Sequence, residues 1–151
     1  MALWDNLKTK SADMNAQLKT KAGQFKNKDF ADGAMAMCAL VAAADGKIDS
    51  TERSKTAGFI TSNDVLSIFP AAELRTSFDR YCDKLDGDFD FGKIEAIQAV
   101  SKLKKKPDQA RAVIQVGIII GGADGDFDAD EKKAVKDACH AAGIDPGEFD
   151  L

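Results

Sequence analysis

The sequence has few of the residue types on which most cofactor and catalytic sites depend. It contains one histidine, one tyrosine and one tryptophan among 151 residues, and its three cysteines form no C-x-x-C pair. An odd number of widely spaced cysteines inside apolar stretches indicates neither a disulfide framework nor a zinc site. We interpret Cys38, Cys82 and Cys139 as reduced residues of the core.

The chain also lacks a long uninterrupted apolar segment. Its longest apolar run, residues 112–123, contains Gln115 and falls well short of the roughly 20 residues that a membrane-spanning helix needs. The N-terminus places an acid at Asp5 and has no basic start followed by an apolar region, so it does not resemble a secretory signal. We therefore expect a cytoplasmic protein.

Signals for catalysis and for nucleic-acid binding are weak. His140 and Cys139 are adjacent on a predicted helix, where neighbouring side chains point about 100° apart and do not form a nucleophile and base pair. Gly121 and Gly122 lead into acidic residues that would repel a phosphate. The lysines of 102–106 have no aromatic residues between them, and the net charge is −4. We expect no enzymatic activity and no nucleic-acid partner.

Helix-forming residues dominate the composition. Apolar residues make up 44% of the chain, Ala, Lys, Leu, Asp and Glu are abundant, and β-forming residues are confined to short runs. A chain of this length can bury one substantial core. We predict an all-α fold, a single compact bundle of seven or eight helices built from two pseudo-symmetric helical repeats.

The repeat is visible as the pattern A-D-G-x-[I/F]-D-x-x-E, which occurs at residues 44–52 and again at 123–131. Each copy follows an apolar run, at 37–43 and at 116–122. The repeated unit is therefore a buried helix that leads into an acidic turn, and internal repetition of this kind constrains the whole fold. A partial third copy, at 86–90, lacks the final acid because Lys93 takes its place.

Apolar periodicity and helix-boundary residues predict the order of the elements. Residues 1–28 form a basic amphipathic N-terminal helix, and residues 29–151 form the helical domain. Half one covers about 29–85, half two covers about 107–151, and a helix at about 90–104 connects them. The predicted helices of the domain are, in order, 29–43, 49–62, 71–85, 90–104, 108–121 and 128–142, with short turns near 63–69 and 145–148.

Several finer features follow from the same signals. Gly87 is expected to end one helix and Asp90 to cap the next, whose inward residues include Ile94. The basic run 102–107 is predicted to be a linker between the halves. Gly117 and Gly121, four residues apart, are predicted to pack closely against another helix. Their expected contacts are Ala36, Ala39 and Ala43.

Two explanations of the acidic turns stay open. In the first, glycine ends a helix, the second Asp caps the next one and the Glu completes a capping box. Capping leaves the first Asp of each copy unexplained, because a helix C-terminus disfavours negative charge by a few tenths to about 1 kcal/mol. In the second, a divalent cation of the Ca²⁺ or Mg²⁺ class offsets that cost. Neither copy has EF-hand spacing. The candidate metal ligands are Asp45, Asp49, Glu52, Asp124, Asp128 and Glu131.

With both motifs in place, the chain resembles the TerB family of tellurite-resistance proteins over essentially its whole length. The resemblance is carried by Ala44, Asp45, Gly46, Ile48, Asp49 and Glu52 and by Ala123, Asp124, Gly125, Phe127, Asp128 and Glu131. It implies an all-helical fold of two related halves, a cytoplasmic bacterial setting, metal binding at the acidic positions and no enzymatic activity. It also implies work in tellurium resistance and stress response with the membrane protein TerC and TerD-like calcium-binding proteins.

The expected function is a non-enzymatic, metal-binding scaffold that links cytoplasmic Ter proteins to a membrane partner. Residues 1–28 carry six lysines against two acids, whereas residues 123–151 carry nine acids against three lysines. Opposed charges of this kind favour docking to charged partners, and the basic helix could reach the inner face of the membrane. The alternatives are direct thiol-based handling of tellurite by the cysteines and a metal-independent protein interaction module.

Overall fold

The computed structural model of this chain describes residues 25–123, residue 125 and residues 127–151. In these ranges the chain is helical and contains no strand, so the all-α prediction is confirmed. The predicted N-terminal helix lies almost entirely outside the described residues, and the total of seven or eight helices stays a prediction. The described elements are α2 (Lys28–Ala42), α3 (Ser50–Ser62), η2 (Leu66–Ile68), α4 (Ala71–Gly87), α5 (Phe89–Ser101), η3 (Lys102–Lys105), α6 (Pro107–Gly121), α7 (Ala129–Ala142) and η4 (Pro146–Phe149).

Local signals place most of the helix ends as predicted. The Asp49 carboxylate accepts a 2.7 Å hydrogen bond from the Glu52 amide and starts α3. Pro107 occupies the first turn of α6, where its missing N–H costs no hydrogen bond. Gly143 ends α7 in the left-handed conformation, at φ +72°. No helix within the described ranges has the length and apolarity that crossing a membrane requires.

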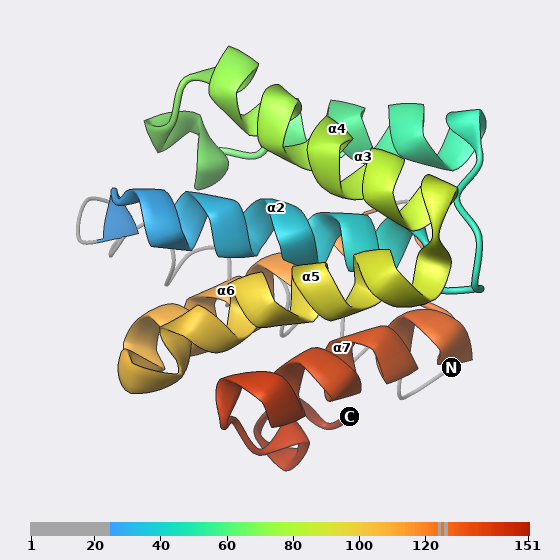
Figure 1. Ribbon diagram of the computed structural model, residues 1–151. Helices are drawn as coiled ribbons and strands as arrows, with labels where there is room; N and C mark the ends of the chain where they lie inside the picture. The colour runs from blue at the N-terminus through green and yellow to red at the C-terminus, as the bar shows by residue number, and fades with distance from the viewer. Residues whose placement is uncertain (1–24, 124, 126) are drawn as a thin grey trace.

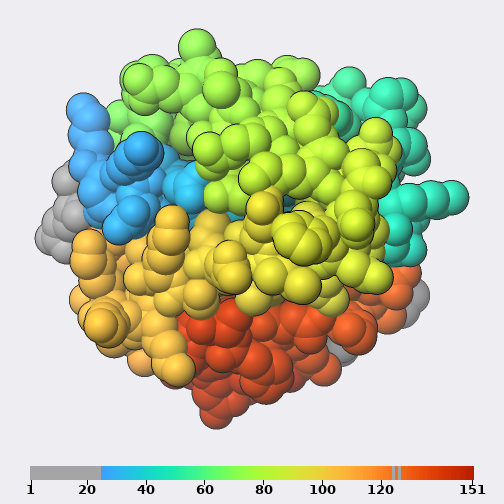
Figure 2. Space-filling model, viewed as in Figure 1, coloured from blue at the N-terminus to red at the C-terminus, as the bar shows by residue number. Residues whose placement is uncertain are grey.

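Helix α2 lies at the centre of the bundle and packs against α4, α5, α6 and α7 (Figure 1). Its sequence is apolar on nearly all sides, and every residue from Gly33 to Ala42 is buried. Side chains of α4, α5 and α7 close over the face shown in Figure 2, where α2 reaches the surface mainly near its N-terminal end. The central helix therefore organises the positions of all the others.

Helices α2 and α6 pack in parallel. Near the N-termini of the two helices, the side-chain amide of Asn27 donates a 3.1 Å hydrogen bond to the side-chain oxygen of Gln109. Further along, a Cβ at Gly117 would lie 2.7 Å from Met37, and one at Gly121 would lie 2.9 Å from Val41. The predicted close contact of α6 is confirmed, but its partners are Met37 and Val41, whereas alanines were expected. A large side chain on one helix fills the gap left by a glycine on the other.

Three finer predictions are wrong. Asp88, which was expected to precede the cap, is itself the N-cap of α5 and accepts from the Phe91 amide at 3.1 Å, because α4 continues through Gly87. Residues 102–105 form the 3₁₀ segment η3 directly after α5, whereas a linker was predicted, because the buried side chain of Leu103 anchors them to the core. Ile94 points outward and is 55% exposed.

Candidate functional site

The first acidic corner joins α2 to α3. Gly46 has φ +95°, a conformation that glycine adopts without steric cost, and its amide bonds to the Ala43 carbonyl at 3.0 Å. Ile48 then packs against the core, and the Asp49 carboxylate caps α3 through the Glu52 amide. The predicted helix stop and start are confirmed.

The second acidic corner joins α6 to α7 and has the same backbone design. Gly125 has φ +89°, and its amide bonds to the Gly122 carbonyl at 3.0 Å. Asp128 accepts from the Glu131 amide at 2.8 Å, while the Glu131 carboxylate accepts from the Asp128 amide at 3.1 Å. This is a complete capping box, as predicted. Asp124, the remaining candidate ligand of this corner, lies outside the described residues.

The structure gives Asp45 a local role that the sequence argument did not supply. Its side-chain Oδ1 accepts a 3.2 Å hydrogen bond from the amide of Lys47. An aspartate that bonds the backbone two residues ahead forms an Asx turn, which stabilises a tight corner without any ligand. Capping does not account for Asp45, as predicted, but this Asx turn gives the residue a structural role without a ligand. A second carboxylate oxygen remains beside the one used in the turn.

The partial third copy, at the junction of α4 and α5, differs in its chemistry. Lys93, which replaces the final acid, places its Nζ 3.2 Å from the Asp137 carboxylate of α7. Burial alone would raise the pKa of Asp137, but hydrogen bonds from Lys133 and Lys93 outweigh it, and the pKa is lowered. This junction links α5 to α7 by an ion pair.

All three copies lie at one end of the bundle. Because α2 and α6 are parallel, the turns that follow them emerge side by side, and the α4 to α5 junction lies next to them at the right of Figure 1. A hollow of about 40 Å³ is lined jointly by Ala44 of the first corner, Phe89 of the junction and Asp130 of the second corner. We call the end formed by residues 44–52, 86–90, 123, 125 and 127–131 the acidic end.

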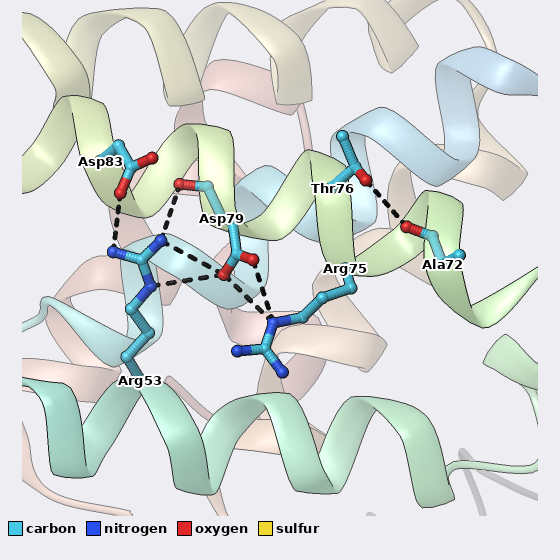
Figure 3. Close-up of polar contacts among 6 residues, drawn as sticks. All are labelled: Arg53, Ala72, Arg75, Thr76, Asp79 and Asp83. Carbon is cyan, nitrogen blue, oxygen red and sulfur yellow. Dashed lines mark hydrogen bonds and ion pairs between the residues drawn. The ribbon is translucent and has the colours of Figure 1, made fainter.

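An arginine on α3 fixes the first corner to the rest of the bundle. The Arg53 guanidinium contacts the Asp79 carboxylate at 3.2 Å and the Asp83 carboxylate at 2.8 Å, both on α4, and also donates to the Asp79 carbonyl (Figure 3). Arg75 reaches the same Asp79 from within α4. Since α3 buries only Thr56, Ala57 and Ile60, these polar contacts help to hold its position.

The candidate carboxylates share one end of the molecule without forming a preformed chelate. In the described residues, which leave out Asp124, no group of three or more His, Cys, Asp or Glu side chains is arranged to hold a metal ion. Asp49 and Asp128 are exposed, and each uses one carboxylate oxygen as a helix cap. Any cation here would be held by exposed oxygens near a corner.

The three cysteines are free and buried, as predicted. Burial raises the pKa of Cys82 and of Cys139 to about 12 and raises that of Cys38 further. A thiol with a raised pKa carries almost no thiolate at neutral pH and is a poor nucleophile. His140, beside Cys139 on α7, is exposed. These two side chains therefore do not act as a nucleophile and base.

Thiol labelling of the folded protein tests this arrangement. We expect an aromatic disulfide reagent at neutral pH to modify the three cysteines roughly a hundredfold more slowly than in the unfolded chain, because labelling requires local opening. Absorbance of the released thiolate gives the rate, and the protein in guanidinium chloride is the control. Rapid modification of even one cysteine in the folded protein would contradict the buried placement of the three thiols.

Two larger hollows that the sequence did not indicate lie near the start of α2. One, of about 680 Å³, lies between α2 and α4 and is lined in part by Asn27, Phe69 and Leu74. The other, of about 440 Å³, lies between α2, α4 and α5 beside Asp32, which accepts from the Tyr81 hydroxyl at 2.8 Å. No motif marks these surfaces, because they depend on how helices distant in the sequence meet.

Comparison with known proteins supplies the family. The family model described as "Tellurite resistance protein TerB" matches residues 31–151, which include both acidic motifs. A tellurium resistance protein TerB from an Alcaligenes species is 32% identical over 118 residues, covering 78% of this chain and 97% of that protein. No solved structure matches the chain. The chain belongs to the TerB family of tellurite-resistance proteins.

Proposed function

We propose that this protein is a non-enzymatic binding component of the tellurite-resistance response whose acidic end takes up a divalent cation of the Ca²⁺ or Mg²⁺ class. Membership of the TerB family supports the setting. The observation that carries the cation proposal is the parallel packing of α2 on α6, because it brings two acidic corners to the same end. Exposed Asp45, Asp49 and Asp128 concentrate negative charge at that end, and a divalent cation would offset it.

The hydrogen bonds of the corners leave oxygens available to such a cation. Asp45, Asp49 and Asp128 each use Oδ1 for a backbone amide, so that each retains Oδ2. Hard cations of this class prefer carboxylate and carbonyl oxygens. The proposed ligands remain the six acids named from the sequence, with Asp45 and Asp49 at one corner and Asp124 and Asp128 at the other.

Cation binding should stabilise the fold. A ligand at a hundredfold excess over its Kd adds about 2.7 kcal/mol to the free energy of unfolding. For a chain of this size we expect about 10 mM Ca²⁺ or Mg²⁺ to raise Tm by roughly 5–10 °C. The double variant Asp45→Asn, Asp124→Asn should lose more than half of this increase. Thermal unfolding followed by circular dichroism measures the shift, and amide NMR shifts locate the binding.

The matched control is Glu73→Gln with Asp108→Asn. It removes the same charge from exposed positions in the first turns of α4 and α6, away from the acidic end. This control should retain the full increase in Tm. The cation proposal fails if the amides of 44–52 and 123–131 do not shift at millimolar ion, or if the control loses as much as the double variant.

The proposed partners are a TerC-like membrane protein and TerD-like proteins, with the chain in the cytoplasm and at the inner face of the membrane when bound. Partner binding that survives both a chelator and the Asp45→Asn, Asp124→Asn substitutions would favour the metal-independent interaction module. Direct thiol chemistry on tellurite has less support, because the three cysteines are buried and their pKa values are raised.

A further inference from the structure

Two large apolar side chains on α5 are exposed to solvent. Phe91 is 64% exposed and Ile94 is 55% exposed, whereas the other large hydrophobic residues in the described ranges are buried or half-buried. Residues three apart lie on the same face of a helix, so the two side chains form one patch. Figure 2 views the side of the molecule where the surface of α5 lies open between α4 and α7. Exposed apolar clusters are typical of binding surfaces.

The fold prevents α5 from turning this patch inward. Gly92, between the two residues, lies so close to α4 that a Cβ there would be 2.7 Å from backbone atoms of Lys84 and Leu85. Ion pairs from Lys84 to Glu95 and from Lys93 to Asp137 hold the flanks of α5. The close backbone contact and the flanking ion pairs together set the rotation of the helix about its axis. Phe91 and Ile94 are therefore presented outward.

The residues just before the patch carry negative charge, of which Asp88 is partly engaged as the N-cap of α5. Asp86, Asp88 and Asp90 are all exposed and lie within the five residues before Phe91. Within the described part of the chain none of the three forms an ion pair. The nearby cations Lys84 and Lys93 are paired with Glu95 and Asp137. A partner that covers Phe91 and Ile94 would thus gain from positive charge at one edge of its contact surface.

We infer that Phe91 and Ile94, with Asp86 and Asp90 at their edge, bind an amphipathic helix of a protein partner that carries an apolar stripe and flanking lysines or arginines. A helix laid on a helical face makes contact through residues spaced three and four apart, which matches this patch. The inference goes beyond the proposed function, because it uses none of the six candidate cation ligands and needs no metal.

The test uses a fluorescent amphipathic peptide of leucine and lysine, titrated into the full chain with a chelator present and followed by anisotropy. Replacing Phe91 and Ile94 by glutamine should weaken binding at least tenfold, since buried apolar side chains at the centre of a contact dominate affinity. Asp86→Asn with Asp90→Asn should weaken it by about threefold to tenfold and reduce its salt dependence. The matched peptide with glutamate in place of lysine should bind at least tenfold more weakly.

The control variant is again Glu73→Gln with Asp108→Asn, which should bind the lysine peptide as the unchanged protein does. Exposed substitutions in α5 should preserve the circular dichroism spectrum, which checks folding. Equal peptide binding by the Phe91→Gln, Ile94→Gln variant would overturn the inference. Two other results would also overturn the inference. If the unchanged protein forms a concentration-dependent dimer, or binds anionic phospholipid vesicles, and the Phe91→Gln, Ile94→Gln variant does not, then a second copy or a membrane covers the patch. If the protein proves not to bind a cation, the peptide affinities expected here stay the same, because the peptide titration is carried out with a chelator present.

Discussion

Replacing Phe30 by alanine is expected to lower the free energy of unfolding by about 3–5 kcal/mol, the range for a fully buried aromatic residue. Phe30 has no exposed surface and lies in the first turn of α2. Its ring stacks on Phe25 with centroids 5.3 Å apart and on Phe69 with centroids 6.1 Å apart. The substitution therefore removes both aromatic contacts and leaves a cavity where α2 meets the segment before α4.

Urea unfolding followed by circular dichroism measures this loss, and Phe91→Ala is its matched control. The same atoms are removed at Phe91, but that side chain is 64% exposed, so we expect a change within about 1 kcal/mol. In thermal unfolding, the Phe30 variant should lose roughly 10 °C or more of Tm. Similar losses at both positions would show that burial does not account for the contribution of Phe30.

The second large effect is expected at Gly92. An alanine Cβ would lie 2.7 Å from the Lys84 carbonyl carbon and oxygen and from the Leu85 amide nitrogen, all of which are backbone atoms. Backbone cannot move aside as a flexible side chain can, so α5 must shift away from α4. We expect Gly92→Ala to cost about 2–3 kcal/mol, despite the better helix propensity of alanine.

Gly58→Ala provides the comparison, because Gly58 also lies inside a helix but a Cβ there would meet nothing within 4 Å. This variant should be more stable than the unchanged protein by about 0.5–1 kcal/mol, since alanine favours the helix. Denaturant unfolding of both variants measures the change in the free energy of unfolding, which should fall for Gly92→Ala and rise for Gly58→Ala. If Gly92→Ala were also stabilising, α5 would not be locked against α4, and the outward presentation of Phe91 and Ile94 would lose its structural basis.

Helix bounds were predictable from the sequence wherever the deciding residues lie within one turn of the boundary. The helix predicted at 49–62 is α3 at 50–62, and the one predicted at 128–142 is α7 at 129–142. Caps at Asp49 and Asp128 act on amides three residues away, so that neighbouring residues alone decide them. The same is true of the two left-handed glycines, Gly46 and Gly125.

Local signals misplaced three features of α5 and of the segment that follows it. The sequence predicts Asp90 as the N-cap of this helix. Helix α4 continues through Gly87, so the chain turns at Asp88, and the Asp88 carboxylate caps α5 through the Phe91 amide. Periodicity predicts Ile94 in the core, yet the close approach of Gly92 to α4 turns it outward. The basic run 102–107 is predicted to be a linker, but the buried side chain of Leu103 anchors its first residues to the core as η3.

The sequence by itself determined the helices, the buried cysteines and the identity of the two acidic corners, because these depend on composition and on residues close together in the chain. Only the tertiary structure decided that the corners share one end of the molecule. That placement depends on Met37 and Val41 filling the gaps at Gly117 and Gly121, and hence on the parallel alignment of α2 and α6. A contact between distant segments is set by the shapes of two surfaces, and local pattern does not encode which surfaces meet.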